Sequence, residues 1–291
     1  MSLKLINLIC VILCCLTYSQ TAKTAEIENK TKSNNIANRI ITLTSLSTDI
    51  INKISPEKLV GITGSSLFKN KKEFDELPKI SSGRTPPNLE KIVSLKPDLV
   101  IGTRGFHDKI LNKLNAVNIE TLSYELSNLN DLESLSRLIS TKVGINYLET
   151  TKPIIDNNLE KCILKVENKS KPNLVVLAST KPILSPNSKS WAGSLMNRLG
   201  LNNLTKDLDS KSEFRGYVNL SPEWLVKEDP DNIVLIQTRP GQYVDFEKSK
   251  PFSNLQAVKT KQVYRFSYYG LINAGSLESI NNACLKLRKI F

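Results

Sequence analysis

Apolar positions in this chain follow two patterns, short unbroken runs and runs at helical spacing. The run Ile40–Leu43 predicts a strand, and the Ser/Thr-rich turn after it leads into a helix that Ser47 or Thr48 could cap. The segment "KLVGITG" predicts a second strand, which Gly61 and Gly64 bring to an end. The folded part of the chain therefore begins as strand, helix, strand.

The same alternation continues through the first half of the chain. A helix over about residues 89–95, stopped by Pro97, precedes the apolar strand "DLVIG", and the helix "DKILNKLNAV" precedes the strand "IETLSY". Strands that alternate with helices at this interval predict a mostly parallel, doubly wound sheet. We predict an N-terminal α/β lobe over residues 39–142.

Residues 131–168 show no strand pattern, and their apolar residues recur at helical spacing. Pro153 disfavours one continuous helix, so we expect two helices or a break just before it. The second helix is predicted to connect two lobes over residues 143–170. The alternation then resumes with "LVVLAS", "SWAGSLMNRLGL", "NIVLIQ", "QVYRF" and a final amphipathic helix "SLESINNACLKLRKIF". These segments predict a second α/β lobe over residues 171–291.

The stretches "LEKIVSLKPDLVIG" and "PEWLVKEDPDNIVLIQ" repeat one pattern 133 positions apart. In each, a Glu near the start of a short helix, Glu90 or Glu223, stands seven positions before a Pro-Asp pair that opens into an apolar strand. The apolar residues of both helices are expected to pack on their sheets: Leu89, Ile92, Val93, Leu225 and Val226. A single Glu at a helix start is most simply a solvated residue favoured by the helix dipole. Two in equivalent places indicate a shared role.

Over about residues 38–291 the chain resembles the periplasmic binding proteins that deliver cobalamin, ferric siderophores or haem to ABC importers. The segments "RIITLTSLSTDII", "NLEKIVSLKPDLVI" and "GYVNLSPEWLVKEDPDNIVL" carry the resemblance. It implies two doubly wound (Rossmann-like) lobes joined by a long rigid helix, with a ligand cleft between the lobes. It also implies that Glu90 and Glu223 pair with basic residues of a permease dimer, which works with an ATPase. We accordingly expect a monomeric, non-catalytic protein without a cofactor.

Ligands of doubly wound folds bind outside the carboxyl ends of the strands, where several candidate residues fall. Arg84 and Tyr217 stand six residues before the two glutamates, in segments expected to line the mouth of the cleft. Relatives that bind a corrin ring tend to have an aromatic residue at this position in both lobes. Tyr217 matches this tendency, and Arg84 does not. Other candidates offer flat faces to a macrocycle or paired donors to carboxylates: Arg104, Phe106, Trp191, Arg239, Tyr268 and Tyr269. Cobalamin or a related corrinoid ranks level with a ferric siderophore, and haem ranks behind both.

Other classes of site receive less support. His107 is the only histidine, which excludes a multi-histidine zinc or manganese site. We expect it on the surface at a helix start, while ligation of a haem or corrin metal stays open. The sequence contains no G-x-S-x-G elbow, so a two-lobed transferase or hydrolase is the weaker alternative, together with a sensor that does not transport its ligand.

The N-terminus matches a secretory signal peptide over residues 1–24, with a short basic start and an apolar stretch at Leu8–Leu16. Cys14 and Cys15 lack the small preceding residue of a lipoprotein signal, so we expect cleavage and a soluble periplasmic protein in preference to a lipid anchor. Residues 25–38 are polar and aperiodic, which predicts a flexible lead-in.

Two features of composition complete the picture. Beyond the leader only Cys162 and Cys284 remain, and they could either pair in an oxidising compartment or stay as buried thiols. The net charge is +12, but the lysines are spread along the chain, which favours a solvated basic surface over nucleic-acid binding.

Overall fold

The computed structural model describes residues 36–83, 85–163, 172–209, 212–237 and 246–291. The predicted signal peptide and most of the predicted lead-in lie outside these residues. In the described part of the chain, no helix has the length and apolar character needed to cross a membrane.

Lobe one, residues 37–143, is built on a parallel sheet with strand order β3-β2-β1-β4-β5. Its central strands are short and strongly apolar, as expected of strands covered on both faces. In β4, for example, Leu99, Val100 and Ile101 are fully buried. The strands are β1 (Ile40–Thr42), β2 (Leu59–Thr63), β3 (Lys79–Ser81), β4 (Leu99–Thr103) and β5 (Glu120–Tyr124).

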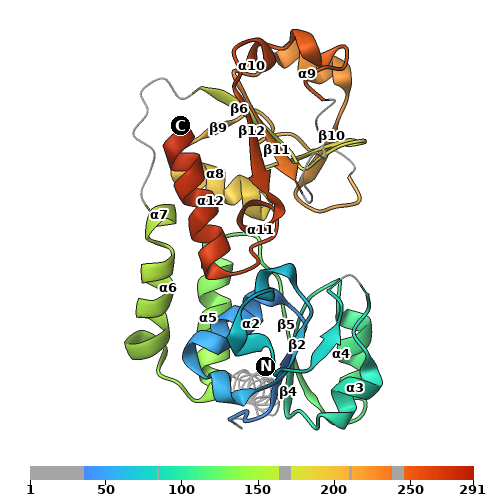
Figure 1. Ribbon diagram of the computed structural model, residues 1–291, viewed down its shortest axis with the longest axis vertical. Coiled ribbons are helices and arrows are strands. Elements are labelled where there is room, and N and C mark those ends of the chain that lie inside the picture. The colour runs from blue at the N-terminus through green and yellow to red at the C-terminus, as the bar shows by residue number, and fades with distance from the viewer. Residues whose placement is uncertain (1–35, 84, 164–171, 210–211, 238–245) are drawn as a thin grey trace, which may run out of the picture. The chain divides into compact units, whose positions relative to one another are not determined.

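Successive side chains of a strand point to opposite faces of the sheet, so both faces carry apolar groups. Helices cover both of these faces (Figure 1). Ile40 packs with helices α2 and α5, whereas its neighbour Ile41 packs with α3 and α4. The helices are α2 (Ser45–Ile54), α3 (Leu89–Ser94), α4 (Asp108–Asn115) and α5 (Leu129–Val143). The N-cap of α2 is Thr44, whose hydroxyl accepts from the backbone N–H of Ser47 at 3.3 Å, so the prediction of Ser47 or Thr48 as the cap is wrong.

The connector leaves α5 at Gly144, and its predicted end at residue 170 lies outside the described residues. Gly144, with a left-handed φ of 75°, ends α5, and a π-helical turn (Tyr147–Thr151) then leads into α6 (Lys152–Asn158) and α7 (Glu160–Ile163). Val143, where the connector was predicted to start, is the last residue of α5. Pro153 is the second residue of α6. A proline in the first turn of a helix is tolerated, because the backbone N–H groups there have no hydrogen-bond partner within the helix.

Lobe two, residues 172–291, has a parallel sheet with strand order β12-β11-β6-β9 and a small antiparallel sheet, β10-β8-β7, which the sequence did not predict. Its strands are β6 (Asn173–Leu177), β7 (Ser179–Thr180), β8 (Ile183–Pro186), β9 (Asn202–Asn203), β10 (Tyr217–Leu220), β11 (Asn232–Gln237) and β12 (Val263–Ser267). Its helices are α8 (Trp191–Leu199), α9 (Pro222–Glu228), α10 (Gln256–Lys259), α11 (Tyr268–Leu271) and α12 (Leu277–Ile290). Helices α8 and α12 pack on one face of the parallel sheet, and α9 and α10 pack on the other.

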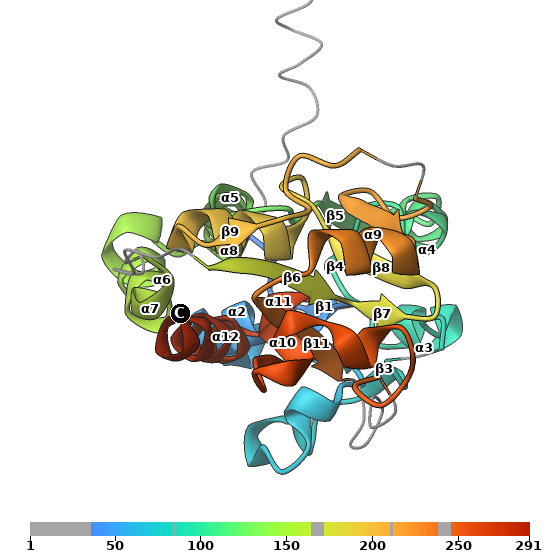
Figure 2. The same ribbon diagram turned by 90° about the horizontal axis from the view of Figure 1, so that it is seen from above.

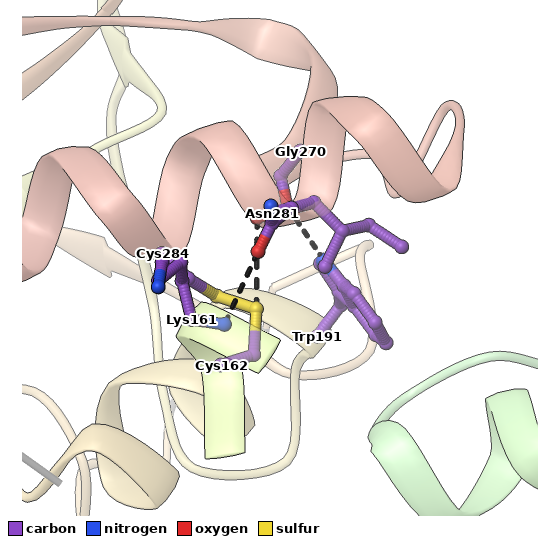
Figure 3. Close-up of a disulfide and its surroundings, with 7 residues drawn as sticks. Lys161, Cys162, Trp191, Gly270, Asn281 and Cys284 are labelled. Carbon is purple, nitrogen blue, oxygen red and sulfur yellow. Dashed lines mark hydrogen bonds between the residues drawn. A yellow bond between two sulfur atoms is a disulfide. The ribbon is translucent and has the colours of Figure 1, made fainter. Parts of the chain in front are cut away.

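A disulfide fastens the connector to lobe two. Cys162 of α7 is bonded to Cys284 of α12, and both residues are fully buried (Figure 3). Beside the bond, the backbone N–H of Lys161 donates to Oδ1 of Asn281 at 3.2 Å. Helices α7 and α12 consequently lie side by side (Figure 2). Of the two states that the sequence left open for these cysteines, the structure has the paired one.

Hydrogen bonds and ion pairs also link the two lobes directly. Asp49 of α2 is buried and accepts a hydrogen bond at 2.9 Å from the backbone N–H of Leu277, the first residue of α12. Burial raises the pKa of Asp49 above its ordinary value, although the bond from Leu277 opposes the shift. Nearby, Lys71 of lobe one pairs with Glu278 of lobe two at 3.2 Å. These contacts anchor the start of α12 on lobe one.

Candidate ligand-binding site

A cavity with a volume of about 540 Å³ is lined by residues of both lobes. It lies at the carboxyl ends of the lobe-one strands, where ligands of doubly wound folds bind. Its volume falls in the usual range for small-molecule sites. The predicted cleft between two α/β lobes is therefore present.

The lobe-one wall of this cavity is rich in hydroxyl groups. Each of the five parallel strands ends at the cavity, and the last residues of the strands and the loops after them contribute serine, threonine and tyrosine side chains. These residues are Thr44, Ser45, Thr63, Ser65, Ser81, Thr85, Thr103 and Tyr124. Some of them bond to each other, as Thr44 Oγ1 does to Tyr124 Oη at 2.8 Å and Thr63 Oγ1 does to Ser81 Oγ at 2.9 Å. Burial raises the pKa of Tyr124 to about 12, so its phenol stays neutral.

Two glycines bring the loops after β2 and β3 together on this wall. Gly83 has a φ of +81°, and a Cβ added to it would lie 2.0 Å from the carbonyl oxygen of Gly64. Only glycine fits such a close approach of two backbones. Both glycines line the cavity, so their loops form part of its floor.

The lobe-two wall is aromatic. Trp191, the first residue of α8, and Tyr268 and Tyr269 of α11 line it. The indole Nε1 of Trp191 donates to the carbonyl oxygen of Gly270 at 2.9 Å, which fixes the ring (Figure 3). Gly270 is itself held closely, because a Cβ there would lie 2.0 Å from the carbonyl oxygen of Ser279 in α12. The aromatic wall is thus braced against α12.

The rim of the cavity carries charge and one exposed ring. Arg104 and Phe106 follow β4, and the Phe106 side chain is 83% exposed. Across the cleft, Arg215 of lobe two pairs with Glu125, which follows β5, at 2.6 Å. Because the Arg215 side chain is 79% exposed, solvent screens this pair and it is expected to add little stability.

His107 lies inside the wall and is only 5% exposed, so the prediction of a surface position is wrong. Its Nδ1 accepts a hydrogen bond from the backbone N–H of Thr103 at 3.0 Å, which requires the tautomer that carries its proton on Nε2. Burial lowers the pKa of His107, while nearby Asp108 opposes this effect. The Thr103 hydroxyl lies 2.9 Å from the same Nδ1, so both the backbone and the side chain of Thr103 hold the ring.

The other predicted ligand contacts have different positions. Tyr217 opens β10 and is not among the described residues that line the cavity; burial and the neighbouring Tyr268 raise its pKa. Arg84 and Arg239 lie outside the described residues, so their roles stay predictions. In that described part of the chain, no cluster of three His, Cys, Asp or Glu side chains could hold a metal ion.

The sequence did not single out the hydroxyl wall, Glu125 or Arg215. A usable signal existed, because most hydroxyl residues of the wall lie at or just after the end of a predicted strand; Ser81 and Thr85 lie at or after the end of β3, which the sequence did not predict. Serine and threonine are also the ordinary residues of turns, however, so the signal becomes specific only when the strand order is known.

Glu90 and Glu223 lie where the sequence predicted them, each the second residue of its helix, in α3 and α9. Both are exposed, and in the described part of the chain neither has an ion-pair partner. Its own backbone N–H and the Ser221 hydroxyl hold the pKa of Glu223 below its ordinary value. The prediction that Val93 and Val226 pack on the sheets is wrong, since each is 42% exposed.

The sequence profile of the periplasmic binding protein family matches residues 40–268. The chain therefore belongs to this family, and its two-lobed α/β fold agrees with that membership. Members are substrate-binding proteins of ABC transport systems that act outside the cytoplasm and carry ligands in place of cofactors. Because they are not enzymes, the prediction of a non-catalytic protein is confirmed.

Individual relatives differ in what their names say they bind. The Fe(3+)-citrate-binding protein YfmC of Bacillus subtilis is 31% identical over 189 residues, which cover 62% of this chain but only 57% of that protein. The uncharacterized ABC transporter substrate-binding lipoprotein YvrC of the same organism is 23% identical over 78% of this chain and 71% of its own length. The periplasmic vitamin B12-binding protein BtuF of Vibrio cholerae has a similar fold, with a TM-score of 0.60 and 21% identity over 87% of this chain and 98% of that structure.

Proposed function

We propose that this protein captures a ferric chelate rich in carboxylate or hydroxamate oxygens and delivers it to an ABC importer permease. The observation that carries the proposal is the cavity between the lobes, with hydroxyl donors on one wall and aromatic rings on the other. Hydroxyl groups can donate to the acceptor oxygens of such a chelate, and Arg104 at the rim supplies a positive charge. The similarity to an Fe(3+)-citrate-binding protein supports the same class of ligand.

A corrinoid is the second candidate. Trp191, Tyr268 and Phe106 present aromatic surface to the cavity, which would suit a flat macrocycle. Haem ranks third, with Tyr268 and Tyr269 of the cavity wall as candidate axial ligands for its iron.

Fluorescence titration of the purified protein tests this ligand assignment. The probes are ferric citrate, a ferric hydroxamate, a ferric catecholate, haemin and cyanocobalamin, with iron-free citrate and N-acetyltryptophanamide as controls for binding and absorption. Ferric citrate or the hydroxamate should bind with a dissociation constant below about 1 µM, which is typical of a specific site. If no probe binds more tightly than roughly tens of micromolar, the assignment of the cavity is wrong.

The chain provides a matched pair of tryptophans for this titration. Trp191 lines the cavity, whereas Trp224 of α9 is partly buried against the core of lobe two. The ligand should still quench the fluorescence of Trp224→Phe, because Trp191 remains. Quenching should largely disappear in Trp191→Phe, and the reverse result would place the ligand elsewhere.

We further propose that Glu90 and Glu223 are the contacts with the permease dimer. Two equivalent subunits present two equivalent surfaces, and one exposed carboxylate per lobe matches that symmetry. An exposed carboxylate is complementary in charge to a basic side chain of such a partner.

Export of the chain as a soluble monomer with residues 1–24 removed is also a proposal. A lipid-anchored form is the alternative, and the similarity to a protein named as a lipoprotein favours it. The intact mass of the protein isolated from its source cells distinguishes the two, because an acylated cysteine at the N-terminus would contradict soluble export.

A further inference from the structure

The repeated motif preserves more than its glutamates when the two copies are aligned at their offset of 133 residues. Among the positions with the same or a similar residue in both copies, five lie in the helix and in the turn after it. The matched pairs are Glu90 with Glu223, Ile92 with Leu225, Val93 with Val226, Pro97 with Pro230, and Asp98 with Asp231.

Folding explains the buried and turn positions of this repeat. Ile92 and Leu225 are fully buried and hold α3 and α9 on their sheets. Asp98 accepts hydrogen bonds from the backbone N–H groups of residues 38 and 39 at 2.8 and 2.9 Å, just before β1. Asp231 accepts one from the backbone N–H of Asn173 at 2.8 Å, where β6 begins. Each aspartate therefore fixes the start of the neighbouring strand.

Folding does not explain the two valines. Val93 and Val226 are each 42% exposed, although valine is a poor residue for an exposed helical position because its branched side chain is restricted there. Each stands three positions after its glutamate, and residues at that spacing are neighbours on one face of a helix. An exposed apolar group thus lies beside an exposed carboxylate at equivalent places in both lobes.

We propose that Glu90 with Val93, and Glu223 with Val226, form two equivalent docking patches, in which the valine enters an apolar hollow next to the basic side chain of one permease subunit. The proposal rests on the proposed function and deepens it. The charge explains attraction and orientation, whereas the apolar contact removes water from around the ion pair, an arrangement that strengthens protein interfaces.

Threonine substitutions test the valines with little effect on the fold, because threonine has the same branched shape. The variants are Val93→Thr and Val226→Thr, alone and together, and the matched control is Val117→Thr, at a 55% exposed valine away from the repeat. Glu90→Gln with Glu223→Gln serves as the reference for loss of the charge.

Binding is measured with fluorescently labelled, ligand-free protein on right-side-out membrane vesicles from source cells that lack this chain. Specific binding is the part displaced by unlabelled wild-type protein, and protein-free vesicles of the same lipids give the background. Each threonine variant should raise the half-saturating concentration roughly five- to ten-fold, as expected when a partly exposed apolar side chain is buried on docking. Val117→Thr should leave it unchanged.

The possible results separate the two levels of the proposal. If the glutamine variant weakens binding and the threonine variants do not, the valine contact is refuted and the proposed function stands. An equal effect of all three valine substitutions also refutes it, as does equal binding to protein-free vesicles. If wild-type protein shows no displaceable binding, or the glutamine variant binds like wild type, docking through these helices is itself wrong.

Discussion

The imidazole of His107 shows how one buried side chain shapes the cleft wall. Its Nδ1 accepts from the N–H of Thr103, and a Cβ on Gly102 would lie 2.9 Å from its Cβ, so the turn after β4 closes tightly around it. Protonation of Nδ1 would break the bond to Thr103 and place a charge in a desolvated position. The residue therefore serves the wall of the cavity as a neutral ring.

This arrangement predicts a specific pH dependence of stability. Because the folded-state pKa of His107 lies below its ordinary value of 6.5, its contribution is present above that value and is lost as the pH falls through the folded-state pKa. His107→Asn keeps an acceptor for the Thr103 N–H but cannot titrate. Urea unfolding between about pH 7.5 and about pH 5 should show a fall in the free energy of unfolding for wild type that is smaller in the variant. Parallel pH profiles would contradict this role.

Among the elements, the regular strands and helices were predictable and the irregular ones were not. The strands of both parallel sheets, apart from short β3 and β9, follow from apolar runs that alternate with helical segments, because the central strands are buried on both faces. The antiparallel strands β7, β8 and β10 span only two to four residues, and β8 contains Pro186, so neither alternation nor apolar length reveals them. The pairing of Cys162 with Cys284 depends on a spatial approach that spacing along the sequence does not encode.

The disulfide should contribute strongly to the stability of lobe two. It joins residues 122 positions apart, so in the unfolded chain it would close a very long loop, and on the chain-entropy model such a loop is worth about 4 to 5 kcal/mol. Cys162→Ser with Cys284→Ser should lower the free energy of unfolding in urea by up to this amount. Reductant should destabilise wild type and leave the double variant unchanged. Free thiols at both positions in the purified protein would contradict the pairing.

At the scale of the whole molecule, the two copies of one motif organise the functional surfaces. Sequence alone placed the two glutamates at helix starts and gave the class of fold. It also placed Trp191, Tyr268, Tyr269 and Arg104 at strand ends or in loops, and the fold brings these four to one cavity. It did not reveal the hydroxyl wall, because these residues become neighbours only through the order of strands in the sheet.

The central claim is that the protein hands its ligand to an importer through Glu90 and Glu223. The most direct test is uptake of the radiolabelled chelate by source cells that lack the chain and are complemented with wild type or with Glu90→Gln plus Glu223→Gln. Wild type should restore uptake, whereas the double variant should bind the chelate with unchanged affinity and fail to restore it. Full uptake with the double variant would refute docking through these residues, and uptake that never depends on the chain would make the protein a sensor or a carrier of something else.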